Sequence, residues 1–148
     1  MVDHNILSNG PLIAALLAGS IAQILKVLFN YLKEHRWNFA LLLHAGGMPS
    51  SHSSMAAAVA HSLGLEQGFG SPVFALSFVL AMIVIYDATG IRRQAGRHAR
   101  IINQIITELA SGHPLKQEQL REVLGHTPFE AFVGMALGIL IAQIIWWL

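Results

Sequence analysis

Residues 11–32 read PLIAALLAGSIAQILKVLFNYL and contain one charged side chain, Lys26, near their far end. A helix of these 22 residues extends about 33 Å, which is enough to cross the hydrocarbon core of a bilayer. Asn9 and Pro11 supply a usual start signal for a helix. The stretch therefore predicts a transmembrane helix that remains in the mature chain, since no basic, signal-like start precedes it.

The composition of the whole chain agrees with a membrane environment. Of its 148 residues, 54% are hydrophobic and 11% charged, and the mean hydropathy is +0.55. Soluble domains carry roughly 25% charged residues, and disordered chains need low hydrophobicity, so both classes are disfavoured. The net charge of +1 indicates no nucleic-acid partner, and without cysteine the chain has no thiol nucleophile. We expect one domain, residues 1–148, in the cell (inner) membrane.

Three more apolar segments follow the first. Residues 49–65 are short and rich in Ala and Ser, which suits close packing inside a bundle better than contact with lipid. Residues 72–89 are apolar almost throughout, and residues 128–148 end in two tryptophans that fit an interfacial belt. The pattern predicts an all-α integral membrane bundle of about four membrane-embedded helices.

The polar region 90–127 separates the last two apolar segments. Within it, isoleucine and leucine recur at helical spacing between residues 101 and 109, with polar side chains at the other positions. This pattern predicts an amphipathic helix that lies in the membrane interface. A second, short helix is expected over residues 116–124.

The basic residues are segregated along the chain. If all four segments cross the membrane, one face receives all nine of them, and the other face receives none. By the positive-inside rule that face is cytoplasmic, and both termini lie outside. The nine are Lys26, Lys33, Arg36, Arg92, Arg93, Arg97, Arg100, Lys116 and Arg121.

Three polar segments are expected at the same face. They are residues 48–54, which open the second helix, residues 86–93, which close the third, and residues 125–130, which open the fourth. Ionisable groups at membrane depth are costly and usually functional. Together the segments offer two histidines, two acids and several arginines, which is a set that suits phosphoryl transfer.

Each residue type has a part in that chemistry. Arginine and lysine bind the phosphate oxygens, and a helix N-terminus supplies free N–H groups to an anion. One histidine attacks phosphorus while a carboxylate orients its ring, and the other protonates the leaving oxygen.

Two motifs make the resemblance specific. Gly-Gly-Met-Pro-Ser-Ser-His, residues 46–52, resembles the Pro-Ser-Gly-His motif of the type 2 phosphatidic acid phosphatase superfamily. His126 and Glu130 are similar to its third motif, in which a nucleophilic histidine precedes an acid by four positions. Most of the chain resembles the divergent branch of that superfamily, the small membrane proteins related to acid phosphatase and vanadium-dependent haloperoxidase.

The resemblance implies the catalytic roles. His126 would be the nucleophile that forms a phosphohistidine, Glu130 would orient it in place of the usual Asp, and His52 would be the general acid. Ser50 and Ser51 would bind the phosphate.

The basic residues match the superfamily pattern less closely. Lys26 is followed at the spacing of the first motif by Lys33, where the superfamily has Arg-Pro, and Arg36 is an alternative. Arg92 and Arg93 are the preferred further phosphate ligands because of their Asp-Ala-Thr-Gly-Ile-Arg-Arg context. A rival alignment makes His98 the nucleophile, but Ile102 stands at the acid position; Leu120 occupies the superfamily's arginine position, one residue before Arg121.

Simpler structural roles are open for several of these residues. The Pro-Ser-Ser-His segment could have no role beyond the start of a helix, since serine is a favoured cap. The segment of His126, Thr127 and Pro128 could likewise simply start a helix. Asp87 is interpreted as a supporting ion-pair partner of Arg92 or Arg93, and His61 as a packed, hydrogen-bonded residue. No metal or other cofactor is expected, because no His-Glu-x-x-His spacing occurs and the resemblance implies none.

The favoured function is hydrolysis of a lipid phosphate monoester or pyrophosphate, for example phosphatidylglycerol phosphate or a polyprenyl phosphate. Two alternatives remain open: an inactive membrane protein that binds a phospholipid headgroup or anion, and a small transporter-like protein. The expected partners are the lipid substrate and membrane lipids. A homo-oligomer is also allowed, because Gly134, Ala136 and Gly138 form a small-residue face.

The charge distribution predicts the orientation of the chain. We expect the C-terminus to lie on the non-cytoplasmic side. Alkaline phosphatase, which is active only on that side, should therefore be active when it is fused after Leu148. A fusion to a fluorescent protein that folds only in the cytoplasm serves as the complementary control. Activity of the cytoplasmic reporter alone would overturn the assignment.

Overall fold

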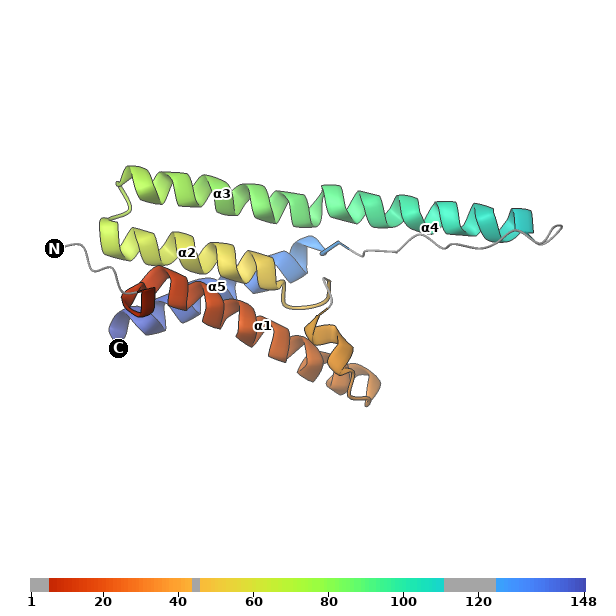
Figure 1. The fold of residues 1–148 in the computed structure, drawn as a ribbon, viewed down its shortest axis with the longest axis horizontal. Coiled ribbons are helices and arrows are strands. Elements are labelled where there is room, and N and C mark those ends of the chain that lie inside the picture. The colour runs from red at the N-terminus through yellow and green to blue at the C-terminus, as the bar shows by residue number, and fades with distance from the viewer. Residues whose placement is uncertain (1–5, 44–45, 111–124) are drawn as a thin grey trace.

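The computed structural model describes residues 6–43, 46–110 and 125–148. In this part of the chain all regular elements are helical. Figure 1 shows a bundle of long helices and one helix that projects beyond it. In chain order, the elements are η1 Ile6–Ser8, α1 Gly10–Glu34, η2 Phe39–Leu42, α2 Ser51–Gln67, α3 Pro72–Thr89, α4 Ile91–Ala110 and α5 Pro128–Trp147.

The helices begin where the sequence supplies caps. Asn9, Ser71 and Thr127 each accept a bond from a backbone N–H in the first turn of α1, α3 and α5. A proline follows each cap in the first turn, where its missing N–H costs nothing. The four expected apolar segments are therefore confirmed as helices, with ends that differ by at most two residues.

The helix α2 lies at the centre of the bundle, in contact with α1, α3 and α5. Its buried positions are small residues, and the innermost cluster combines Ala58 with Ala14 and Ala18 of α1 and with Ile141 and Ala142 of α5. Among the residues that the structure describes, three helical segments are long and apolar enough to cross a membrane: α1, α3 with its continuation, and α5. The central position of α2 and its small buried residues confirm its predicted role as a packing helix.

Two glycines of α5 allow α2 to approach it closely. A Cβ at Gly134 would overlap the backbone of Ser50, and a Cβ at Gly138 would overlap the carbonyl oxygen of Ser54. Both glycines are buried inside the bundle. The face that was expected to allow a homo-oligomer is thus largely used within one chain, because Gly134 and Gly138 contact α2 and only Ala136 is exposed.

The amphipathic helix α4 continues the direction of α3 past the end of the bundle (Figure 1). Its isoleucines at 101, 102 and 105 are exposed, and α3 is the element it contacts most. The amphipathic helix is confirmed, and its position in the plane of the interface stays a prediction. The short helix expected over residues 116–124 lies outside the described residues, as do Lys116, Leu120 and Arg121.

One end of the bundle collects the parts expected there. The start of α2, the end of α3 and the start of α5 lie near one another, and α1 runs toward the same end of the bundle (Figure 1). This arrangement agrees with the sequence-based topology. It brings the three polar segments to one end of the molecule.

Substitution of Gly138 by Ala is expected to destabilise the bundle, since the added methyl group must displace the α2 backbone. Overpacking of this kind typically costs about 1–3 kcal/mol. Thermal unfolding in detergent measures the effect. Gly70→Ala is the matched control, because a Cβ there meets open space. Equal unfolding temperatures for the two variants would contradict the close approach.

Candidate active site

The segment that begins α5 places His126 and Glu130. Thr127 is the helix cap, and it forms a capping box with Glu130, whose Oε2 accepts from the Thr127 N–H at 2.9 Å. The backbone N–H of His126 donates to the carbonyl of Ala88 at 3.0 Å, which ties this segment to the end of α3. The predicted spacing of four residues thus sets the two side chains side by side.

The imidazole of His126 faces the carboxylate of Glu130. Its Nδ1 lies 3.5 Å from Glu130 Oε2, a separation at which the groups attract without forming a hydrogen bond in this state. The His126 side chain is only 5% exposed. Burial lowers the pKa of His126 below its ordinary value of 6.5, the charge of Lys26 lowers it as well, and Glu130 opposes both. The imidazole is therefore neutral at pH 7 and keeps a lone pair for attack.

The start of α2 lies directly against this pair. Ser50 is buried, its N–H donates to the carbonyl oxygen of Glu130 at 3.1 Å, and its Oγ accepts from the N–H of Ser53 at 3.3 Å. The capping role considered for this motif is therefore confirmed. Ser51 has a different partner, because its Oγ accepts from Lys26 Nζ at 3.4 Å.

The positive charge of Lys26 acts on both candidate catalytic histidines. Its side chain reaches the site from α1 and is almost fully buried, at 3% exposure. The charge of Glu130 acts on Lys26, and the charge of Lys26 acts on both His52 and His126. A buried ammonium group needs such partners, and one of them, Glu130, is the carboxylate beside the candidate nucleophile.

The end of α3 and the start of α4 bring Arg92 close to the site. Arg92 Nε lies 2.6 Å from Asp87 Oδ2, so Asp87 is the ion-pair partner that the sequence suggested. Both Arg92 and Asp87 are close enough for their charges to act on His52, which is exposed. The backbone of Arg92 and Arg93 lies against Gly125 and leaves no room for a Cβ there.

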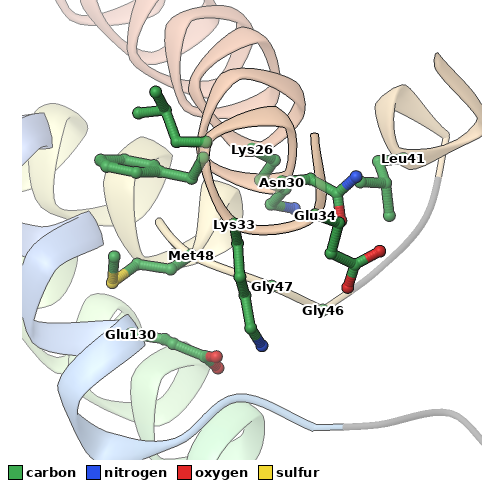
Figure 2. Close-up of a pocket in the computed structure, with 11 residues that line it drawn as sticks. Lys26, Asn30, Lys33, Glu34, Leu41, Gly46, Gly47, Met48 and Glu130 are labelled. Atoms are coloured by element: carbon green, nitrogen blue, oxygen red, sulfur yellow. The ribbon is translucent and has the colours of Figure 1, made fainter. Parts of the chain in front are cut away.

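A cavity of about 580 Å³ adjoins this cluster, and we call it the cationic cavity. Figure 2 shows Lys26 and Lys33 on α1 and Glu130 on α5 around it, with the Lys33 ammonium group extended toward the Glu130 carboxylate. Neither histidine lines the cavity, although Glu130 and Lys26 do. The lining residues are Lys26, Phe29, Asn30, Leu32, Lys33, Glu34, Leu41, Gly46, Gly47, Met48 and Glu130.

Sequence reasoning missed several lining residues. Asn30 and Glu34 share a face of α1 with Lys26 and Lys33, so their helical spacing from Lys26 was the available signal. Gly46 and Gly47 adopt φ of 110° and 80°, which side chains other than glycine rarely tolerate. The alternative ligand Arg36 is exposed and does not line the cavity. Within the described ranges, no group of three histidine or acidic side chains is placed to hold a metal.

The fold and the site together define a membrane-embedded helical bundle with a His–Glu pair, a buried lysine and a serine-capped helix start at one end. The model of the Divergent PAP2 family matches residues 7–141, and the chain belongs to this family. It is 37% identical to "Uncharacterized membrane protein YuiD" of Bacillus subtilis (strain 168), over 95% of this chain and 96% of that protein. No solved structure gives a significant match. The chain is thus a membrane protein of a phosphatase-related superfamily.

The electrostatics of His126 predict its titration. Its NMR midpoint in detergent is expected below 6.5, because burial and the Lys26 charge both favour the neutral ring. Lys26→Met should raise the midpoint, and Glu130→Gln should lower it further. The His126→Gln spectrum identifies the resonance. A wild-type midpoint above 6.5, or shifts of the opposite sign in the two variants, would contradict this arrangement.

Proposed function

We propose that this protein hydrolyses a lipid phosphate monoester or pyrophosphate through a phosphohistidine at His126. The observation that carries the proposal is the buried, neutral His126 with Nδ1 3.5 Å from Glu130 Oε2, beside the start of α2. Membership in the Divergent PAP2 family supports the reaction class, since the superfamily is phosphatase-related.

In the first step, His126 Nε2 attacks phosphorus with the ring proton on Nδ1. The Glu130 carboxylate stabilises that proton, and the long contact between them shortens as the ring gains positive charge. The N–P bond forms as the bond from phosphorus to the lipid oxygen breaks. His52 enters this step as the imidazolium, and the leaving alcohol takes its proton. Burial and the charges of Arg92 and Lys26 lower the pKa of His52, so that its imidazolium gives up a proton readily. Lys26 and Arg92 balance the charge of the phosphoryl oxygens.

In the second step, water attacks the phosphorus of the phosphohistidine. His52, now neutral, accepts the proton of the water, the N–P bond breaks, and inorganic phosphate leaves. Both steps use the same pair of histidines, so the enzyme returns to its starting protonation state. We place this site at the cytoplasmic face, where the basic residues gather.

Phosphate release from a panel of lipid phosphates in detergent tests the proposal. His126→Ala is expected to remove turnover and His52→Ala to reduce it by about 10²–10⁴-fold, the usual contribution of general acid–base catalysis. A transient ³²P label should be acid-labile and absent from His126→Ala. His98→Ala, which removes the rival nucleophile, is the matched control and should retain turnover.

The same panel separates the proposal from a headgroup-binding protein without turnover. Vanadate, a phosphate mimic, should inhibit release and compete with the lipid phosphate. Vanadate-sensitive binding of lipid phosphate by folded wild-type protein, without any phosphate release, would reject the enzyme and favour the binding protein. Loss of turnover in His98→Ala but not in His126→Ala would reject the assigned nucleophile.

A further inference from the structure

The helix α4 carries an apolar face that the described helices leave open. Ile102, Ile105 and Leu109 recur at helical spacing. Ile91 lies on the same face about three turns earlier, and Ile101 precedes Ile105 by about one turn. These five side chains, which we call the apolar face of α4, are between 42% and 64% exposed. A continuous exposed stripe of this kind marks a surface that contacts lipid or another protein.

The opposite side of α4 is basic. Arg93, Arg97 and Arg100 follow one another at intervals of four and three residues, so they share a face that is turned away from the apolar one. The whole helix holds four arginines and one acidic residue. An apolar face with arginines opposite is typical of a helix that lies in the plane of a bilayer surface and is attracted by anionic lipids.

The length of the helical run decides where the apolar face lies when α4 is in line with α3. The 18 residues of α3 span about 27 Å, which already matches the hydrocarbon core of a bilayer. The 20 residues of α4 add about 30 Å in the same direction, past the end of the bundle (Figure 1). With α3 across the membrane, a straight α4 holds its apolar face in water. The face reaches the bilayer only when the chain turns toward the surface.

The junction of the two helices can provide that turn. Gly90 has φ −102° and ψ −85°, outside the helical range, so the helical path is already interrupted there. The hydroxyl of Thr89 donates to the carbonyl of Ile85 at 2.9 Å, a bond that often bends helices. Gly96, a little further along α4, is a second residue without a side chain. Sharp kinks in helices occur at positions of this kind.

We propose that the chain bends between Gly90 and Gly96 and that α4 lies on the membrane surface at the basic end of the bundle. Its apolar face then enters the bilayer, and its arginines lie among anionic phospholipid headgroups. Charge complementarity favours this partner: a second copy of the protein would cover the apolar face but bring more arginine, whereas an anionic bilayer suits both faces. The inference needs only that α3 crosses the membrane, and it does not depend on the proposed function.

A distance between two spin labels tests the bend. The chain has no cysteine, so Val73→Cys and Thr107→Cys can carry the only labels. These positions are about 51 Å apart along a straight helix, and a right-angled bend between Gly90 and Gly96 shortens the distance to about 37 Å. Pulsed electron paramagnetic resonance in nanodiscs measures both populations. The shorter distance should dominate in phosphatidylglycerol mixed with phosphatidylcholine and be rarer in phosphatidylcholine alone. The longer distance alone in anionic nanodiscs, or equal populations in the two lipids, would overturn the inference.

Two matched pairs of variants in the doubly labelled protein test the two faces separately. Ile105→Ser should lower the ratio of bent to straight chains roughly tenfold, because apolar area leaves the bilayer, whereas Gln104→Ser, on the polar side, should not. In anionic nanodiscs Arg97→Gln should lower the ratio about fivefold, the usual contribution of one basic residue near an anionic surface. Arg36→Gln, which removes an exposed arginine outside α4, is its control. Equal effects within both pairs would contradict the proposal.

Single labels identify what covers the apolar face. In anionic nanodiscs a label at Ile105→Cys should be accessible to oxygen and shielded from a water-soluble nickel chelate, as in lipid. A label at Gln104→Cys should be accessible to the chelate. Shielding of the Ile105→Cys label from both reagents, as expected if a second copy or residues 111–124 cover the face, would overturn the inference. Equal access of the chelate to both labels would overturn it as well.

Discussion

The close approach of α2 to α5 determines the rest of the structure. Neither Gly134 nor Gly138 has room for a Cβ, because the α2 backbone at Ser50 and Ser54 occupies that space. At this distance the Ser50 N–H reaches the Glu130 carbonyl, and the start of α2 is held beside the helix start that carries His126. Small residues at such a contact gain dispersion energy that bilayer lipid would not otherwise supply.

The site pairs a buried cation with a neutral imidazole, and the two features depend on one another. Lys26 is kept in the bundle by Ser51 and by the charge of Glu130. The same ammonium group, together with burial, keeps His126 unprotonated. Glu130 opposes that effect and would stabilise the imidazole once it gains positive charge. A buried polar set of this kind is costly in a membrane, which is why it points to chemistry rather than to folding alone.

Most of the fold could be predicted from the sequence, because the signals are local. Apolar length predicts α1, α3 and α5, and the capping residues Asn9, Ser71 and Thr127 mark the starts of these helices. The site could be predicted in part: the motif around His126 and Glu130 required only helical spacing. The packing of Gly134 and Gly138 against α2 of the same chain could not be predicted, because a face of small residues could equally contact a second copy of the protein. Asn30 and Glu34 belong to no motif, and only their helical spacing from Lys26 indicated in the sequence that they line the same cavity.

The sequence by itself determined that the chain lies in a membrane, where its helices are, and that the polar segments meet at one end of the bundle. It also determined the His126–Glu130 pair. Hydropathy, helix caps and i,i+4 spacing are properties of neighbouring residues, so they can be read without the tertiary structure. The tertiary structure alone decided which groups act on one another across helices. It placed Lys26 against Ser51 and brought the Ser50 N–H to the Glu130 carbonyl oxygen. Lys26 and Ser51 are 25 residues apart, and the packing of small side chains between α1, α2 and α5 brings such distant groups within a few ångströms.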